Sequence, residues 1–142
     1  MRWLARARDR APDDDRVALR RAELIEQGPH PAGAMQVANA LRHRQRAGLL
    51  AAELRGRILG RDLGLYRTAL SEVEPAIERA PSAALLSLRA ELLQHTGDAD
   101  RALQAHKAHL AADFTAFESR RRLVDDAVQR GDEALALRLL QA

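Results

Sequence analysis

One pattern occurs three times in this chain, as Arg21-Ala22-Glu23-Leu24-Ile25, Arg55-Gly56-Arg57-Ile58-Leu59 and Arg89-Ala90-Glu91-Leu92-Leu93. Each copy has an arginine, a small residue, a charged residue and two aliphatic residues, and the copies are 34 residues apart. A helical period of this length is typical of stacked helix pairs, which bury a continuous core and present a binding surface. The pattern therefore predicts a repeat protein built from helices.

Two further sets of residues recur at nearly the same interval. A glycine follows each motif-bearing helix, where a left-handed residue would end it, and an alanine lies in the next helix, where close helix approach requires a small side chain. These residues are Gly28, Gly64, Gly97 and Gly131, and Ala34, Ala69, Ala102 and Ala136. The segment 60–64 is one residue longer than its counterparts, so we expect a looser turn there.

The composition favours an all-α domain. The 142 residues are 46% hydrophobic, which is enough for one domain with a buried core. Alanine and leucine carry most of this apolar content, and both are strong helix formers, whereas alternating β-branched runs are missing. The predicted helices cover residues 1–11, 15–27, 31–44, 47–60, 65–79, 83–95, 99–112, 116–129 and 133–141.

These features resemble the tetratricopeptide repeat (TPR) family along the whole chain. Gly56 stands at the family's mid-helix glycine, Tyr66 at the aromatic residue that begins the second helix, and Pro12 and Pro81 at the closing proline. Aliphatic residues replace the family's large aromatics, so the repeats are degenerate. RNA-binding pentatricopeptide repeats are the closest structural alternative. The resemblance implies a right-handed α-solenoid of antiparallel helix pairs in one domain, with a half repeat at 1–14, repeats at 15–48, 49–82 and 83–116, and a truncated repeat at 117–142.

In this family the first helices of successive repeats line a concave groove. The resemblance thus implies a groove that binds a peptide or partner protein, with a row of mixed charge along it. For any single residue, a solvated face with ion pairs between repeats, such as Glu23 to Arg57, is the better explanation, each pair being worth under about 1 kcal/mol. For the groove as a whole, the architecture favours binding. The implied groove residues are Arg16, Glu23, Gln27, Glu53, Arg57, Arg61, Ser87, Glu91, His95, Arg121, Asp125 and Gln129.

Nothing in the sequence points to catalysis, a cofactor or a metal. The chain has no cysteine, no glycine-rich phosphate loop, no Gly-x-Ser-x-Gly elbow and no His-Glu-x-x-His pattern. His106 and His109 have the i, i+3 spacing that brings two imidazoles to one face of a helix, but two ligands make an incomplete site. We expect these two residues to be partly buried packing histidines.

The charge leaves a second class of partner open. Residues 1–71 hold 14 basic and 8 acidic residues, whereas residues 72–142 hold 9 and 12. A nucleic-acid-binding repeat could use this basic half, and the arginine-rich segments 42–46 and 120–122 could contact phosphates. No aromatic residues interleave with these arginines for base stacking, so a protein partner is favoured over nucleic acid.

The ends of the sequence raise the question of what covers them. The last helix carries Leu135, Leu137, Leu139 and Leu140 and has no polar capping helix after it, and Trp3 begins a helix without its pair. Either the domain is excised from a larger multidomain protein, which we favour, or the terminal helices pair in a homodimer.

No stretch has the length of a signal peptide or a membrane span, so we expect a cytoplasmic protein without membrane insertion. The predicted function is a non-enzymatic adaptor or scaffold, or the targeting domain of a larger bacterial enzyme.

Overall fold

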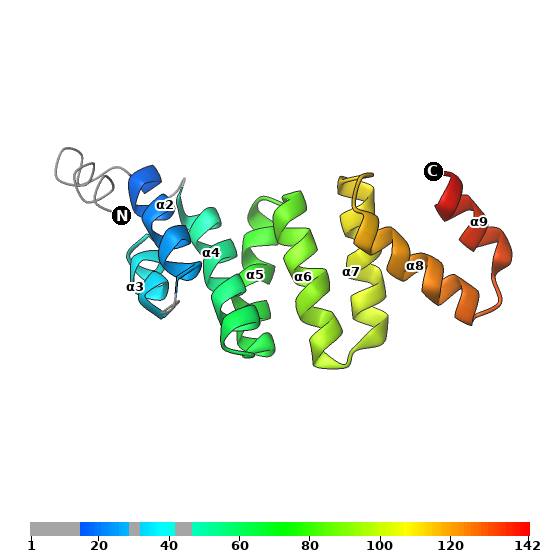
Figure 1. The fold of residues 1–142 in the computed structure, drawn as a ribbon, viewed down its shortest axis with the longest axis horizontal. Coiled ribbons are helices and arrows are strands. Elements are labelled where there is room, and N and C mark those ends of the chain that lie inside the picture. Colours follow the sequence, from blue (N-terminus) through cyan, green and yellow to red (C-terminus); the bar gives the residue numbers. More distant parts are fainter. Residues whose placement is uncertain (1–14, 29–31, 42–46) are drawn as a thin grey trace. The chain divides into compact units, whose positions relative to one another are not determined.

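The computed structural model describes residues 15–28, 32–41 and 47–142, and within these residues it contains helices and no strands. The predicted helix over 1–11, together with Trp3 and Pro12, lies outside the described residues. The chain divides into two compact units, residues 1–76 and 77–142. The helices (Figure 1) are α2 (Asp15–Glu26), α3 (Ala32–Ala40), α4 (Ala47–Arg57), η1 (Ile58–Asp62), α5 (Tyr66–Arg79), α6 (Ala83–Thr96), α7 (Ala99–Ala112), α8 (Phe117–Gln129) and α9 (Glu133–Gln141).

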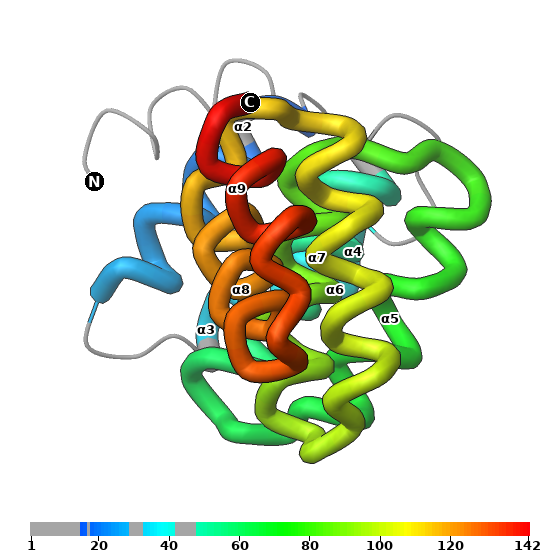
Figure 2. Tube along the Cα trace, turned by 90° about the vertical axis from the view of Figure 1, so that its right-hand side faces the viewer, coloured from blue at the N-terminus to red at the C-terminus, as the bar shows by residue number. Residues whose placement is uncertain are grey.

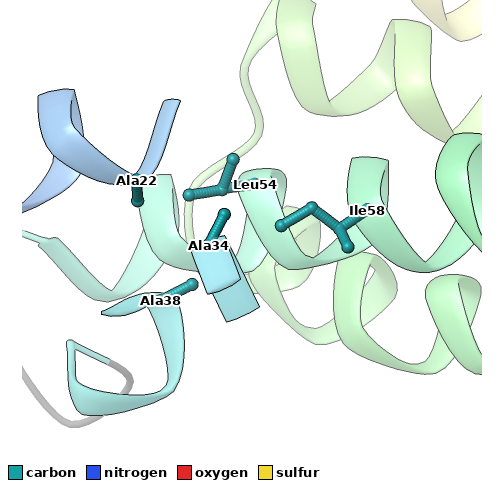
Figure 3. Packing of buried hydrophobic residues seen from close by; sticks show 5 residues of the cluster. All are labelled: Ala22, Ala34, Ala38, Leu54 and Ile58. Atoms are coloured by element: carbon teal, nitrogen blue, oxygen red, sulfur yellow. The ribbon is translucent and has the colours of Figure 1, made fainter. Parts of the chain in front are cut away.

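The core of the first unit lies where α2, α3 and α4 meet. Each of these helices contacts the other two, and Figure 3 shows side chains from all three converging on one point. Three of the five buried residues in this cluster are alanines, which let the helix backbones approach closely. The cluster consists of Ala22, Ala34, Ala38, Leu54 and Ile58.

The second unit is a series of antiparallel helices. In Figures 1 and 2, α7 runs back along α6 and α9 runs back along α8, and contacts also join α7 to α8. The small residue of the sequence pattern is buried, with Ala90 only 1% exposed, and the aliphatic residues after it, Leu92 and Leu93, form the core. The four alanines predicted to allow close helix approach, Ala34, Ala69, Ala102 and Ala136, are all buried.

Side-chain caps begin the helices of the second unit. Ser82 accepts a hydrogen bond from the Leu85 N–H at 3.2 Å and so caps α6. Asp98 and Asp132 cap α7 and α9 in the same way. A carboxylate at this position accepts a hydrogen bond from an otherwise unpaired backbone N–H. Its negative charge is also stabilised by the partial positive charge at the N-terminus of the helix. These two carboxylates therefore have a structural role.

The glycine turns follow the prediction at three of four positions. Gly64, Gly97 and Gly131 have φ values of 66°, 80° and 73°, the left-handed conformation that only glycine adopts without strain. Gly28 does not share it. The Gly28 N–H donates to the Ile25 carbonyl at 3.0 Å, so α2 ends in a tighter turn that needs no left-handed residue.

The extra residue in segment 60–64 is accommodated in a helix, and the predicted looser turn is wrong. After Arg57 the chain continues as the π-helical turn η1, in which the Leu63 N–H donates to the Ile58 carbonyl five residues earlier, at 3.0 Å. A π turn holds one more residue than an α turn, so the insertion widens the end of the helix. Ile58 stays fully buried in the process.

Candidate functional site

The charged residues of the first unit gather around Arg57. Its Nη2 donates to Glu26 Oε2 at 2.7 Å and its Nε donates to Glu26 Oε1 at 3.0 Å, while Nη1 donates to Glu53 Oε1 at 3.1 Å. The hydrogen bond to Glu26 is the main reason that the pKa of Arg57 is raised. Two carboxylates on two helices thus hold one guanidinium on the surface of the first-helix pair α2 and α4.

The expected ion pair between Glu23 and Arg57 is replaced by this arrangement. Glu23 instead accepts a hydrogen bond from Arg20 Nη1 at 2.9 Å, on an exposed part of α2. Glu26 lies one helical turn after Glu23, on the same face, and it reaches the Arg57 guanidinium with both oxygens. Sequence reasoning missed Glu26 because the 34-residue period places Glu23, and not Glu26, in register with Arg57.

A second guanidinium in the first unit is buried. Arg55, the first residue of the repeated motif, is 7% exposed. Its Nη2 donates to Glu72 Oε1 at 2.7 Å and its Nη1 donates to Asn39 Oδ1. Because buried charges need such partners, Arg55 ties α4 to α3 and α5 and is a structural residue. The other predicted groove residues of this unit, Arg16, Gln27 and Arg61, are exposed.

The predicted groove residues of the second unit lead to a polar cavity between α6, α7 and α8. The cavity has a volume of about 230 Å³. Ser87 and Glu91, both predicted as groove residues of a first helix, line it from α6. We call it the polar cavity; its lining residues are Ser87, Glu91, Gln94, His106, His109, Glu118 and Ser119.

A chain of hydrogen bonds forms the wall of the polar cavity. Gln94 Nε2 lies 2.8 Å from His106 Nε2, and the Ser119 hydroxyl oxygen lies 2.8 Å from Nδ1 of both His106 and His109. With the amide N–H of Gln94 donating, His106 Nε2 accepts, so its Nδ1–H donates to Ser119. The Ser119 hydroxyl then donates to His109. Each member satisfies the next, which fixes the position of two buried polar side chains, Ser119 and His106.

The charge state of this wall follows from its burial. Burial lowers the pKa of His106, and the nearby Arg122 and His109 lower it further, against the opposite effect of Glu118. The pKa of Glu118 is lowered chiefly by its hydrogen bond from Arg121. At neutral pH the wall therefore holds a neutral His106 and an ionised Glu118. The prediction that His106 and His109 are packing histidines is consistent with this network.

The remaining predicted residues of the second unit are more dispersed. His95 lines a neighbouring cavity of about 480 Å³, together with Gln94, His106 and Arg122. Arg121 is exposed and donates to Glu118 at 2.9 Å. Asp125 and Gln129 are exposed and line neither cavity. The row of mixed charge that the resemblance implies along the groove consists of Glu23, Arg57, Glu91 and Asp125. Its continuity stays a prediction.

Sequence reasoning also missed Ser119, although a signal for it exists. Counting back by the repeat length from Ser119 leads to Leu85 and then Ala51. Both of these residues are buried and apolar, at 2% and 0% exposure. A serine at a position that is otherwise core must find a hydrogen-bond partner inside the protein. The register of the repeats therefore marks Ser119 as an unusual residue.

The arginines proposed for phosphate contact are engaged within the protein where the structure describes them. Arg121 and Arg122 donate to Glu118 at 2.9 and 3.2 Å, and Arg120 donates to the Phe114 carbonyl at 2.7 Å. The segment 42–46 lies outside the described residues.

Within residues 15–28, 32–41 and 47–142, no group of three or more metal-ligating side chains could hold an ion. None of the helices in those ranges is long and apolar enough to cross a membrane.

An apolar cavity of about 500 Å³ lies between α7, α8 and α9, with Leu103, Leu110, Leu135 and Leu139 among its lining residues. Beyond it, Leu137 and Leu140 are 57% and 65% exposed. The position four residues after the small alanine of the second helix can be compared between repeats. It is occupied by Ala38, Val73, His106 and Leu140, and the first three of these are buried. Leu140 thus occupies a position that is covered in the other repeats.

Comparison with known proteins supports the architecture. No protein-family model matches the chain, and no curated protein matches its sequence. Among solved structures, a thermophilic TPR protein of Thermus thermophilus matches with a TM-score of 0.67 and 22% sequence identity, over 96% of this chain and 75% of that chain. A likeness at this identity shows the fold. The all-α repeat architecture is therefore confirmed as TPR-like.

Proposed function

We propose that this chain is a non-enzymatic protein-interaction module that binds a peptide or partner protein on the surface of its first helices. Stacked helix pairs expose an extended surface whose side chains vary while the packing residues stay constant. Here the packing positions are small or aliphatic and the neighbouring motif positions are charged. This distribution of residue types favours recognition over chemistry.

The observation that carries the proposal is the polar cavity of the second unit. Ser87 and Glu91, which the repeat register predicts as groove residues, line one hollow together with residues of α7 and α8. In concave binding sites, precisely placed polar groups fix the orientation of a ligand and provide specificity. The hydrogen-bonded wall of Ser119 and His106 supports it, because a preformed site loses less entropy on binding.

Selection from a random peptide library displayed on phage tests the proposal. The full chain is immobilised, enriched peptides are synthesised, and their affinities are measured by calorimetry. We expect micromolar binding that Glu91→Arg weakens by at least about tenfold, because the substitution reverses a charge at the cavity. The matched control is Glu78→Arg, the same charge reversal on the exposed surface of α5 outside the described cavities. Failure to enrich any peptide, or equal effects of both variants, would contradict the proposal.

Self-association is a second candidate function, and the exposed end of the second unit favours it. Leu137 and Leu140 on α9 and Val128 on α8 are each more than half exposed. Neighbouring leucines on one helix end form an apolar patch that is costly to leave in water. A second copy of the chain would cover this patch with the same residues, as two-fold symmetric dimers do.

A further inference from the structure

We propose that the polar cavity receives the basic side chain, lysine or arginine, of a partner peptide. This inference rests on the proposed interaction function and adds the chemistry of one anchor residue. It depends on the residues that line the cavity between α6, α7 and α8. The size, the charge and the rigidity of the cavity each support it.

The size of the cavity fits one side chain. Its volume of about 230 Å³ is below the range of about 300–1,000 Å³ that is usual for sites of drug-sized ligands. A cofactor or nucleotide would not fit. A single long side chain inserted from a bound segment would, since its charged end needs only the innermost part of the space.

The charge of the lining favours a cation. Two of the seven lining residues are the acidic Glu91 and Glu118, and none of the seven is lysine or arginine. Gln94 and Ser87 add an amide and a hydroxyl, and the buried His106, whose pKa is lowered, adds no charge at neutral pH. An incoming ammonium or guanidinium would donate to carboxylates, which are the strongest acceptors that a protein offers. A carboxylate from the partner would meet like charge, and an apolar group would leave the polar wall without water.

The existing partners of Glu118 do not prevent this. Arg121 and Arg122 bind Glu118 through side chains that are 64% and 47% exposed. Exposed pairs of this kind contribute little to stability and exchange readily with competing cations. The Glu118 carboxylate can therefore accept a further donor from the cavity side without the loss of a buried interaction.

The hydrogen-bonded wall of the polar cavity is rigid. Ser119 and His106 are 2% and 5% exposed, and both are held by hydrogen bonds of 2.8 Å. Binding then requires little reorganisation, so a single anchor residue can dominate the affinity.

A titration of the full chain by NMR tests the inference with n-butylguanidinium as the probe and n-butylurea as its neutral isostere. The measured signals are the imidazole resonances of His106 and His109 and the backbone amide of Ser119. We expect n-butylguanidinium to shift these signals saturably and n-butylurea to leave them unchanged. Glu91→Gln should weaken binding by about fivefold or more, since it removes one charged acceptor. Glu78→Gln, the same substitution at an exposed position of this unit outside the described cavities, is the matched control.

Ser87→Met provides an independent variant, because it fills the cavity from the α6 wall and keeps Glu91. Circular dichroism verifies that each variant is folded. Equal shifts with the urea, or unchanged binding in both Glu91→Gln and Ser87→Met, would overturn the inference. The peptide selection separates this failure from failure of the proposed function: enriched peptides that lack a basic anchor overturn only the cavity's specificity. Saturable guanidinium binding without any enriched peptide would support the cavity and contradict the interaction module.

Discussion

Arg57 and Glu26 form a two-point ion pair between consecutive first helices, with N–O distances of 2.7 and 3.0 Å. The side chains are 24% and 13% exposed, so water competes only partly for them. A parallel pair of N–H donors matches both oxygens of one carboxylate, which makes such a pair stronger and more directional than a single contact. It joins α2 to α4 across an interval of 31 residues.

We expect this pair to stabilise the first unit. Arg57→Ala and Glu26→Ala should each lower the free energy of unfolding by about 1–2 kcal/mol, because each leaves a partly buried charge without its partner. A double-mutant cycle followed by urea unfolding and circular dichroism measures the coupling, which should be about 1 kcal/mol. Glu23→Ala is the control, since Glu23 contacts the exposed Arg20 instead. A coupling between Arg57 and Glu23 as large as that with Glu26 would contradict the assignment.

The sequence predicts the fold well because the fold is periodic. A 34-residue interval between small residues fixes which positions pack, and Ala22, Gly56 and Ala90 are buried as expected. It does not predict which carboxylate meets Arg57. Glu23 and Glu26 share a face of α2, and the choice depends on side-chain reach and the local helix position, which periodicity does not encode.

Removal of the Ser119 hydroxyl should destabilise the second unit. Ser119→Ala leaves both histidine Nδ1 atoms without the Ser119 oxygen, which costs about 1–3 kcal/mol for buried polar groups. The smaller side chain itself is acceptable there, because the equivalent residue two repeats earlier is Ala51. Urea unfolding measures the effect. Ser71→Ala, which removes an exposed hydroxyl bonded to a carbonyl of its own helix, should change stability by less than about 0.5 kcal/mol.

Acid should weaken the same network. Burial lowers the pKa of His106 in the folded chain below its unfolded value of about 6.5. Between the two values the unfolded chain binds more protons, so the contribution of His106 is fully present above about pH 6.5 and is lost as the pH falls through the folded pKa. Thermal unfolding, measured at intervals of about one pH unit from pH 8 to pH 5, follows this loss.

The variant His106→Gln isolates the residue responsible. Glutamine cannot be protonated in this range and keeps hydrogen-bonding atoms near Gln94 and Ser119. We expect its stability to fall less steeply between neutral pH and pH 5 than that of the unmodified chain. His95→Gln, a change at an exposed histidine of α6, should leave the steep fall in place. If His95→Gln removes the pH dependence and His106→Gln retains it, burial of His106 is not its cause.

The last helix shows another limit of sequence reasoning. Leu135, Leu137, Leu139 and Leu140 are equivalent by composition, yet the structure separates them into two pairs. Leu135 and Leu139 line the apolar cavity within the second unit, whereas Leu137 and Leu140 are exposed. Helical periodicity groups Leu135 with Leu139 and Leu137 with Leu140, but only the packing of α9 against α8 decides which pair is covered. A test of self-association must therefore change the exposed pair.

Leu140→Glu should abolish self-association and leave the fold intact. At 65% exposure the leucine contributes little inside the chain, so the free energy of unfolding of the monomer should change by less than about 0.5 kcal/mol. Leu139→Glu is the contrasting change: it places a charge against the leucines of the apolar cavity and should destabilise the second unit by about 1–3 kcal/mol. Sedimentation velocity over a range of concentrations, with urea unfolding of both variants, separates a lost interface from a lost fold. A chain that stays monomeric at every concentration would exclude self-association. A glutamate buried at a two-fold contact would face the same glutamate of the other copy, so unchanged association of Leu140→Glu would place any interface elsewhere.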